Sequence, residues 1–295
     1  MNALLLNADA AILQFFENIR TPVGTFFACL FSLFGETLFL VALICVVYWL
    51  VDRKLGERLV AVSFSSLVVN AFLKDLIARP RPYKAGVVTR VEVDNPLIST
   101  MSLDDFRSFP SGHSQMGAGL FVSTGYHYRN RIVWLVCIGM TLGVMWSRLY
   151  FGVHYPTDVL AGCALGVLFS VLWDFIYARF ESKKYYVLGF FALLSVVFLF
   201  VMPSKTMYEH CGCLLGACLA VPIENKFIRF ENATGVKNRV LRLVLGLACV
   251  GAVFALFSYL PLSFLEKWFW KLVKYFCLVA VGALLVPYLF NKLKI

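Results

Sequence analysis

Residues 185–202 read YYVLGFFALLSVVFLFVM, eighteen consecutive positions without a charged side chain. A segment of this length and composition can span the hydrocarbon core of a bilayer as a single helix. Similar segments predict further spans at residues 36–52, 55–79, 112–128, 132–151, 157–178, 207–224, 240–260 and 270–290. We therefore expect an all-α protein, a polytopic membrane helical bundle with about eight or nine transmembrane helices.

The composition of the whole chain agrees with these spans. Of 295 residues, 60% are hydrophobic and 15% are charged, with a mean hydropathy of +0.79, whereas an average soluble domain is about 25% charged. This composition excludes a disordered chain, a coiled coil and collagen, and it argues against a soluble two-domain enzyme. No internal repeat is visible, so we expect one integral membrane domain over residues 1–295.

The N-terminal region is apolar but interrupted. Residues Ala8–Phe16 predict a short amphipathic helix on the membrane surface. The apolar run from Val23 to Val51 is too long for one upright span, and Gly35-Glu36 interrupts it. A segment that dips into the membrane, followed by a span, would accommodate this run, but the sequence leaves the arrangement open. Glu36 is a candidate helix cap.

The net charge of +10 comes mainly from short loops between the spans, as the positive-inside rule expects of cytoplasmic loops. It therefore requires no nucleic-acid partner. The basic residues that mark the predicted cytoplasmic side are Arg53, Lys54, Arg58, Arg129, Arg131, Arg179, Lys183, Lys184, Lys226, Arg229, Lys237, Arg239, Arg242, Lys292 and Lys294. The intervening loops, at 80–111, 147–156, 203–208 and 261–269, are then non-cytoplasmic. The glycosylation sequence at 232–234 falls in the most basic loop, so we expect it to be unused.

The nine cysteines lie mostly inside apolar segments, where cysteine behaves as a small hydrophobic residue. Cys211 and Cys213 form a Cys-x-Cys pair, but no second pair accompanies it, as a structural zinc site would require. We expect no disulfide framework, no metal ion and no other cofactor.

Lys74 and Arg81 form the first of three polar groups on the predicted non-cytoplasmic side. They are seven positions apart, which is two helical turns, and Pro80 and Pro82 end the helix there. Charged residues at membrane depth are costly and usually functional. Taken alone, this pair is also explained as a basic helix flank whose side chains reach the membrane surface.

Ser111, Gly112 and His113 form the second group, at the start of the predicted span 112–128. A Ser-Gly helix start leaves backbone N–H groups pointing outward, and such groups bind anions. His113 can give or take a proton near neutral pH. Taken alone, the group is also explained as a capped helix with a chance histidine.

Arg148, His154 and Asp158 form the third group. Pro156 suits the first turn of a helix, so His154 precedes that helix and Asp158 lies inside it. Asp158 can then bind one imidazole nitrogen of His154 and leave the other free as a nucleophile. Taken alone, Asp158 is also explained as a first-turn carboxylate favoured by the helix dipole.

Together, the three groups predict a phosphate-binding active site. Two of the four histidines, three cations and one carboxylate fall on one predicted membrane face, beside an anion-binding helix start. Phosphoryl transfer needs cations and N–H groups for the oxygens, a nucleophile, and an acid for the leaving group. Of the other polar residues, His127 is interpreted as interfacial, and Glu209 and His210 as candidate substrate-lining residues.

At these positions the sequence resembles the type 2 phosphatidic acid phosphatase (PAP2) superfamily. The signature of that family is Lys-x6-Arg-Pro, then Pro-Ser-Gly-His, then Ser-Arg-x5-His-x3-Asp. Every position is filled here, by Lys74…Arg81-Pro82, Pro110-Ser111-Gly112-His113 and Ser147-Arg148…His154…Asp158. The resemblance implies a six-helix catalytic core within residues 36–180 and leaves additional C-terminal helices within residues 185–295.

The resemblance also implies a role for each matched residue, in a metal-independent hydrolysis through a phosphohistidine. His154 would attack phosphorus, Asp158 would orient its ring, and His113 would protonate the leaving oxygen. The phosphate oxygens would be held by Lys74, Arg81, Ser111, the Gly112 N–H and Arg148.

The function expected on this basis is a membrane phosphatase that acts on a lipid phosphomonoester or pyrophosphate at the non-cytoplasmic face, with membrane lipids as its surroundings. Two alternatives within the enzyme class stay open: a phosphatase for a soluble sugar phosphate, as in glucose-6-phosphatase, and a lipid phosphotransferase. A transporter or scaffold with a degenerate site is an alternative of another class, which the complete signature disfavours. The active site would face the outside of a plasma membrane or the lumen of the endoplasmic reticulum.

Overall fold

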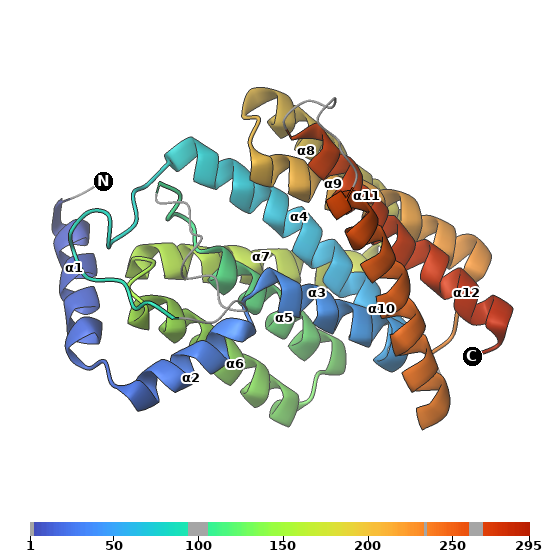
Figure 1. Ribbon diagram of the computed structural model, residues 1–295, viewed down its shortest axis with the longest axis horizontal. Helices are drawn as coiled ribbons and strands as arrows, with labels where there is room; N and C mark the ends of the chain where they lie inside the picture. The colour runs from blue at the N-terminus through green and yellow to red at the C-terminus, as the bar shows by residue number, and fades with distance from the viewer. Residues whose placement is uncertain (1–2, 94–105, 233–234, 260–267) are drawn as a thin grey trace. The chain divides into compact units, whose positions relative to one another are not determined.

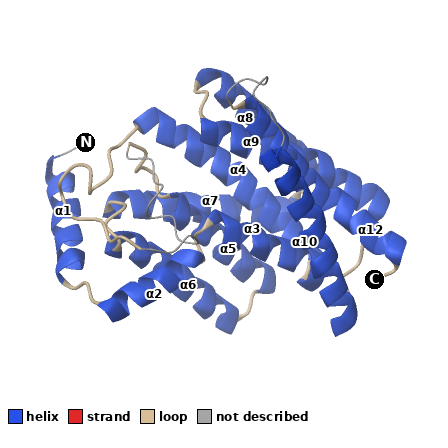
Figure 2. Ribbon diagram, in the orientation of Figure 1, coloured by secondary structure: helices blue, strands red, loops and turns tan. Residues whose placement is uncertain are grey.

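The computed structural model describes residues 3–93, 106–232, 235–259 and 268–295, and the regular secondary structure in these ranges is helical. Figure 2 shows helices and loops and no strand in these ranges. The predicted all-α fold is therefore confirmed. The helices, labelled in Figure 1, are α1 (Ala3–Asn18), α2 (Pro22–Leu33), α3 (Thr37–Val46), α4 (Arg53–Ile77), α5 (Gly112–Tyr128), α6 (Arg131–Tyr150), α7 (Pro156–Arg179), α8 (Lys184–Val201), α9 (Lys205–Ile223), α10 (Val236–Tyr259), α11 (Phe269–Ala280) and α12 (Val286–Leu293).

Within the described residues, seven helical segments are long and apolar enough to cross a membrane, and each corresponds to a predicted span. They are Arg53–Ile77, Arg131–Tyr150, Pro156–Arg179, Glu181–Val201, Lys205–Ile228, Val236–Tyr259 and Phe269–Leu293. The other two predicted spans correspond to shorter elements. The span at 36–52 is α3 with a π-helical turn at Val47–Val51, and the span at 112–128 is α5, which is not among the seven.

The interrupted N-terminal run forms two separate helices. α2 ends at Leu33, and Gly35 and Glu36 form a turn before α3 begins at Thr37. The predicted surface helix at Ala8–Phe16 is part of the longer α1. The turn explains why the run from Val23 to Val51 exceeds the length of one span.

By its backbone contacts the chain forms two compact units, one of Met1–Val41 with Leu73–Asp174 and the other of Ala42–Phe72 with Phe175–Ile295. The boundaries fall inside α3, α4 and α7. All eight residues that the sequence predicts for the site belong to the first unit.

In the first unit, α5 and α6 form a helical hairpin, and α2 packs against α6. Arg129 adopts the left-handed conformation that ends α5, and the Asn130 side chain caps α6 by accepting hydrogen bonds from two backbone N–H groups. Ser170 of α7 donates to the carbonyl of Gly119 in α5 at 2.8 Å. The Ser111 N–H, at the beginning of α5, donates to the carbonyl of Asp158 near the beginning of α7, so the two helices also meet at their N-terminal ends.

The approach of α7 to α5 depends on two glycines one helical turn apart. A Cβ added to Gly162 would lie 2.4 Å from the Ser111 carbonyl oxygen, and one added to Gly166 would lie 2.3 Å from that of Gln115. Small residues at such spacing let membrane helices approach until their backbones touch. Gly162 and Gly166 therefore set the distance between the two helices that carry Ser111 and Asp158.

The second unit contains α8 to α12 and most of α4. A buried polar network joins the beginning of α4 to the beginning of α8 and to the turn after α9: the Glu57 carboxylate binds the Lys184 ammonium at 2.8 Å, and Glu224 binds Arg53 at 2.9 Å. Tyr177 donates to Glu57 at 3.0 Å. The acidic groups named here each have a donor partner, so the network accounts for buried charge in this unit without a ligand.

Candidate active site

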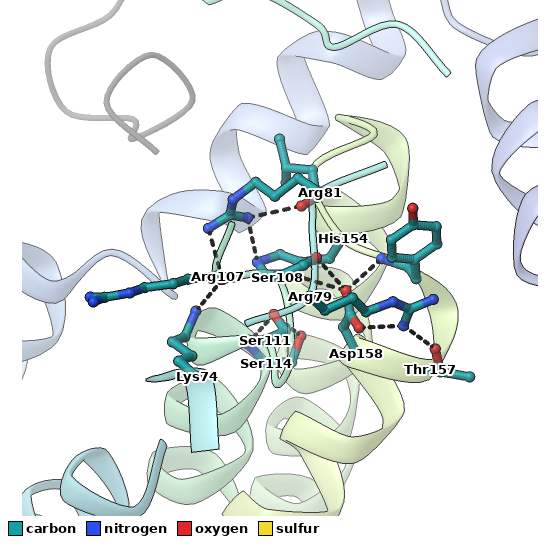
Figure 3. Close-up of polar contacts among 12 residues, drawn as sticks. Lys74, Arg79, Arg81, Arg107, Ser108, Ser111, Ser114, His154, Thr157 and Asp158 are labelled. Carbon is teal, nitrogen blue, oxygen red and sulfur yellow. Dashed lines mark hydrogen bonds and ion pairs between the residues drawn. The ribbon is translucent and has the colours of Figure 1, made fainter. Parts of the chain in front are cut away.

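The centre of the site is His154, which lies between α6 and α7 (Figure 3). Its Nδ1 lies 3.6 Å from Oδ2 of Asp158 and 3.4 Å from the hydroxyl of Ser108. Ser108 donates to the same Asp158 oxygen at 2.5 Å, and the backbone N–H of Tyr155 donates to it at 2.9 Å. Asp158 and Ser108 therefore face one nitrogen of the imidazole, as the sequence predicted for Asp158.

The other imidazole nitrogen faces a cation. Nη1 of Arg81 lies 3.2 Å from Nε2 of His154 and donates to the Val153 carbonyl at 2.9 Å. A guanidinium can only donate, so this contact favours the tautomer with the proton on Nδ1 and the lone pair on Nε2. Nε2 thus has the electron pair that a nucleophile needs.

Lys74 joins Arg81 through a backbone carbonyl. Lys74 lies in the last turns of α4, which ends at Ile77, so Arg81 lies beyond the helix and not on its face. Both side chains nevertheless converge, because Lys74 Nζ donates to the Arg107 carbonyl at 3.1 Å and Arg81 Nη2 donates to the same oxygen at 3.4 Å (Figure 3). The chain turn after α4, with Ala78 at φ 44°, brings this about.

The start of α5 lies beside this group. The Ser111 N–H donates to the backbone carbonyl of Asp158 at 3.0 Å, and the Ser111 hydroxyl caps α5 by accepting from the Ser114 N–H and hydroxyl. The N–H groups of Gly112 and His113 make no hydrogen bond within the described residues. A helix start with such N–H groups attracts anions.

Arg148 and His113 are linked through α2. A guanidinium nitrogen of Arg148, which is 1% exposed, donates to the Ser32 hydroxyl, and Ser32 in turn donates to Glu36 at 3.4 Å. Oε1 of Glu36 lies 3.0 Å from Nε2 of His113. Both predicted histidines therefore have a carboxylate neighbour.

A further cation, Arg79, binds the second oxygen of Asp158 at 2.6 Å. Its other nitrogen binds Asp9 of α1 at 2.9 Å, and its guanidinium lies 3.6 Å from the ring centroid of Tyr155. Asp9 also accepts from the Thr157 hydroxyl at 2.6 Å. Arg79 is thus neutralised by two carboxylates, and the whole group is buried.

Sequence reasoning missed the contributions of Arg79, Ser108 and Asp9. Arg79 lies within the Lys74–Arg81 stretch and Ser108 precedes Phe109-Pro110, so their position near the signature was the one available signal. Nothing in the sequence connects Asp9 with a residue 149 positions later, Asp158. Glu36 was predicted as a candidate cap; it directly precedes α3, and its side chain lies against His113.

The electrostatics of the site favour a neutral His154 imidazole in the absence of a ligand. Burial, followed by the Arg81 guanidinium, holds the pKa of His154 well below its ordinary value of 6.5, and Asp158 opposes the shift. A bound anion would raise this pKa, because it stabilises a protonated ring.

Within the described residues, no group of three or more His, Cys, Asp and Glu side chains has an arrangement that could hold a metal ion. Lys74 acts electrostatically on both His154 and His113, Arg81 on His154 and Arg148 on His113.

Fold and geometry together define a class: an integral membrane protein in which two imidazoles with carboxylate neighbours lie among buried arginines. Comparison with protein families adds two matches. The PAP2 superfamily model matches residues 54–182, and the PAP2 superfamily phosphatase transmembrane extension matches residues 208–295. The chain belongs to the PAP2 superfamily, and it is accordingly a hydrolase acting on phosphoric ester bonds.

Named relatives agree with this assignment. The chain is 25% identical over 196 residues to a lipid A 4'-phosphatase of Bacteroides thetaiotaomicron, covering 62% of this chain and 83% of that protein. It is 35% identical over 125 residues to a lipid A 1-phosphatase of Rhizobium etli, covering 40% of this chain and 48% of that protein. It is 30% identical over 205 residues to the bacitracin transport permease protein BcrC of Bacillus licheniformis, covering 68% of this chain and 93% of that protein.

Proposed function

We propose that this protein hydrolyses a phosphomonoester or pyrophosphate of a membrane lipid through a phosphohistidine on His154. The observation that carries the proposal is the environment of that ring. Asp158 and Ser108 face Nδ1, while Nε2 lies 3.2 Å from the Arg81 guanidinium. A phosphate that binds Arg81 would therefore present its phosphorus to the nitrogen that has the lone pair.

In the first step, Nε2 of His154 forms a bond to phosphorus as the bond from phosphorus to the leaving oxygen breaks. Protonated His113 gives its proton to that oxygen, so the product leaves as an alcohol or a phosphate. The ring of His154 becomes positively charged as it accepts the phosphoryl group, and Asp158 stabilises that charge.

In the second step, a water molecule attacks phosphorus and the bond to Nε2 breaks. Neutral His113 takes a proton from the water, which regenerates the acid and releases inorganic phosphate. An alcohol could attack in place of water, and the protein would then be a phosphotransferase. Measuring free phosphate against phosphorylated acceptor lipid distinguishes the two outcomes.

The negative charge of the transferring group would be balanced by three cations, Lys74, Arg81 and Arg148, together with the N–H groups of Gly112 and His113. These groups supply the oxyanion stabilisation that a metal ion supplies in other phosphatases. We therefore expect phosphate release without added metal and inhibition by vanadate. Loss of activity on treatment with EDTA, restored by a divalent metal, would contradict this part of the proposal.

A lipid substrate is favoured over a soluble one by the membrane character of the chain and by its relatives. The described residues include seven helical segments fit to cross a membrane, and the relatives named above include lipid A phosphatases. The deciding experiment is phosphate release by the purified protein from lipid pyrophosphates, lipid monophosphates and sugar phosphates at matched concentrations. Preference for the sugar phosphates would assign the soluble-substrate alternative instead.

We place the site on the non-cytoplasmic side of the membrane, because the loops that carry the signature alternate with the basic loops. The outer face of a plasma membrane and the lumen of the endoplasmic reticulum are the two locations consistent with this orientation.

A further inference from the structure

The turn between α2 and α3, which interrupts the apolar run, packs against His113 at the start of α5. Gly35 N–H donates to the Ser32 carbonyl at 2.8 Å, and Glu36 N–H donates to the Leu33 carbonyl at 3.1 Å. These bonds fold the turn back on the end of α2. They bring two consecutive residues, Gly35 and Glu36, against the imidazole of His113.

Gly35 packs closely against the His113 side chain. A Cβ at this position would be 2.7 Å from Cδ2 of His113 and 2.9 Å from its Cβ. Heavy atoms do not approach so closely, so an alanine would displace the imidazole or the turn. The glycine therefore makes room for His113.

Glu36 supplies a negative charge at the outer nitrogen of the same ring. Its Oε1 lies 3.0 Å from Nε2 of His113, and both side chains are largely buried. The Nε2 of His113 makes no well-directed hydrogen bond within the described residues. Glu36 is thus close enough to act on the charge of the ring, although the contact is not a well-directed hydrogen bond.

Three charged groups act on His113: Glu36 from the α2–α3 turn, Arg148 from α6 and Lys74 from α4. Both cations disfavour a protonated ring, and Glu36 is the carboxylate that favours it. The Ser32 hydroxyl donates to Glu36 and accepts from Arg148, so one hydroxyl holds both the carboxylate beside His113 and a cation of the proposed phosphate site.

We propose that Glu36 is a positioning residue that keeps His113 protonated and oriented as the proton donor to the leaving group. This inference rests on the proposed phosphatase function. Glu36 and Gly35 lie before residues 54–182, the part of the chain that the PAP2 model matches, so the assignment comes from this structure and not from the family signature. The site then contains two carboxylate–histidine pairs: Asp158 with the nucleophile His154, and Glu36 with the proton donor His113.

The kinetic test compares Glu36→Gln, Glu36→Asp and the control Glu92→Gln with the wild type. Glu92 is a mostly exposed carboxylate on the loop after α4, distant in sequence from the histidines. Loss of a carboxylate this close lowers a histidine pKa by roughly 1 to 3 units. In Glu36→Gln we expect the alkaline limb of the kcat profile to move to lower pH by about 1 to 3 units. kcat at pH 7 should be at least about tenfold lower. KM should not rise, because removal of a negative charge does not weaken phosphate binding.

Two further features separate this role from a merely structural one. The loss should be smaller with p-nitrophenyl phosphate, whose leaving group needs little protonation, than with an alkyl phosphate. Glu36→Asp, which keeps the charge, should recover part of the pH profile. The proposal would be overturned if Glu36→Gln kept the pH profile shared by wild type and Glu92→Gln. It would also be overturned if Glu36→Gln lost the same fraction of activity on both substrates.

A second measurement does not depend on activity. The chain has four histidines, so NMR titration of labelled imidazoles can follow His113 once its signal is identified by its absence in His113→Gln. We expect a lower pKa for His113 in Glu36→Gln than in wild type. An unchanged value would contradict the role of Glu36. A wild-type protein that releases no phosphate from any ester would instead contradict the proposed function, and the titration would still decide the pairing.

Discussion

The imidazole of His154 shows how neighbouring residues can give two nitrogens of one ring different properties. Arg81 can only donate to Nε2, and the Asp158 carboxylate lies on the side of Nδ1. The Ser108 hydroxyl contacts both groups: it lies 3.4 Å from Nδ1 and donates to the Asp158 carboxylate. Ser108 therefore completes the link between His154 and Asp158, whose direct separation of 3.6 Å is longer than a hydrogen bond.

The first prediction at this scale separates the two histidines. His154→Ala should abolish phosphate release from every substrate, because no phosphoenzyme can form. His113→Ala removes only the acid, which commonly contributes a factor of about 100 to 10,000. A substrate with a good leaving group, such as p-nitrophenyl phosphate, should restore part of the activity of His113→Ala but none of that of His154→Ala. Equal inactivity of the two variants on all leaving groups would refute this division of roles.

The second prediction concerns pH. Burial and Arg81 lower the pKa of His154, so its neutral, nucleophilic form persists below pH 6.5 in the empty enzyme. A bound phosphate adds negative charge and raises the pKa of both histidines. We therefore expect bell-shaped profiles in which the kcat limbs, which report the complex, lie at higher pH than the kcat/KM limbs.

The measurement is steady-state kinetics between about pH 4 and 9, corrected for the substrate phosphate, which titrates near pH 6. Flat profiles across the range where imidazoles titrate would show that neither histidine exchanges a proton in the reaction.

At the scale of elements, α1 contributes a buried charge to the site. Asp9 is 3% exposed and accepts from Arg79, from the Thr157 hydroxyl and from the Thr157 N–H. The helix that the sequence predicted to lie on the membrane surface is thus attached to the beginning of α7. Arg79 binds both Asp9 and Asp158, so it connects α1 to the carboxylate beside His154.

The third prediction tests that attachment. Asp9→Ala leaves Arg79 with one carboxylate, and removal of one partner from a buried ion pair costs up to about 3–5 kcal/mol. The thermal unfolding midpoint in detergent should therefore fall, and phosphate release should fall with it. Gln14→Ala, an exposed change on the same helix, should leave both unchanged. Asp9→Ala behaving like Gln14→Ala would mean that α1 does not support the site.

The fourth prediction concerns the packing of α7 on α5. In Gly162→Ala the added methyl group would lie 2.4 Å from the Ser111 carbonyl oxygen, so the start of α5 must move, at a typical cost of about 1–3 kcal/mol. We expect lower stability and a lower kcat, because Ser111 and Gly112 shift away from His154. Gly139→Ala is the matched control, since a Cβ there meets no atom within 4 Å. A fully active Gly162→Ala would show that this close approach does not position the site.

At the scale of the whole molecule, the predicted orientation in the membrane determines which substrates can reach the site. The fifth prediction uses a variant in which the nine native cysteines are replaced. A cysteine at Glu92, on the exposed loop after α4, should react with an impermeant thiol reagent in intact cells. A cysteine at Arg131, at the start of α6, should react only after permeabilisation. The reverse pattern would place the site on the cytoplasmic side. In an intracellular membrane, the comparison is made on sealed vesicles of known orientation.

A cysteine at Ser99 would probe the same loop, but Ser99 lies outside the described residues, as does most of the predicted loop at 261–269 and part of the sequence motif at 232–234. The proposed single-domain organisation, with a core within residues 36–180 and further helices within residues 185–295, likewise stays a prediction beside the two compact units.

The sequence by itself determined the helical class, seven long spans and the eight residues of the signature, including Lys74, Arg81 and Asp158. It could do so because apolar length is a local property of the chain, and because the signature residues are ordered along it. Helix ends were also predictable within a few residues, since proline and glycine act locally.

Tertiary structure alone decided the partners of those residues. Arg81 reaches His154 although α4 ends before it, Arg79 links Asp158 to Asp9, and Glu36 lies against His113. Each of these contacts joins residues at least 70 positions apart, and each depends on how separate helices and loops pack together. Sequence spacing along one helix specifies which residues share a face, but it does not specify what that face meets, because burial of a charge is decided by the packing of several helices at once.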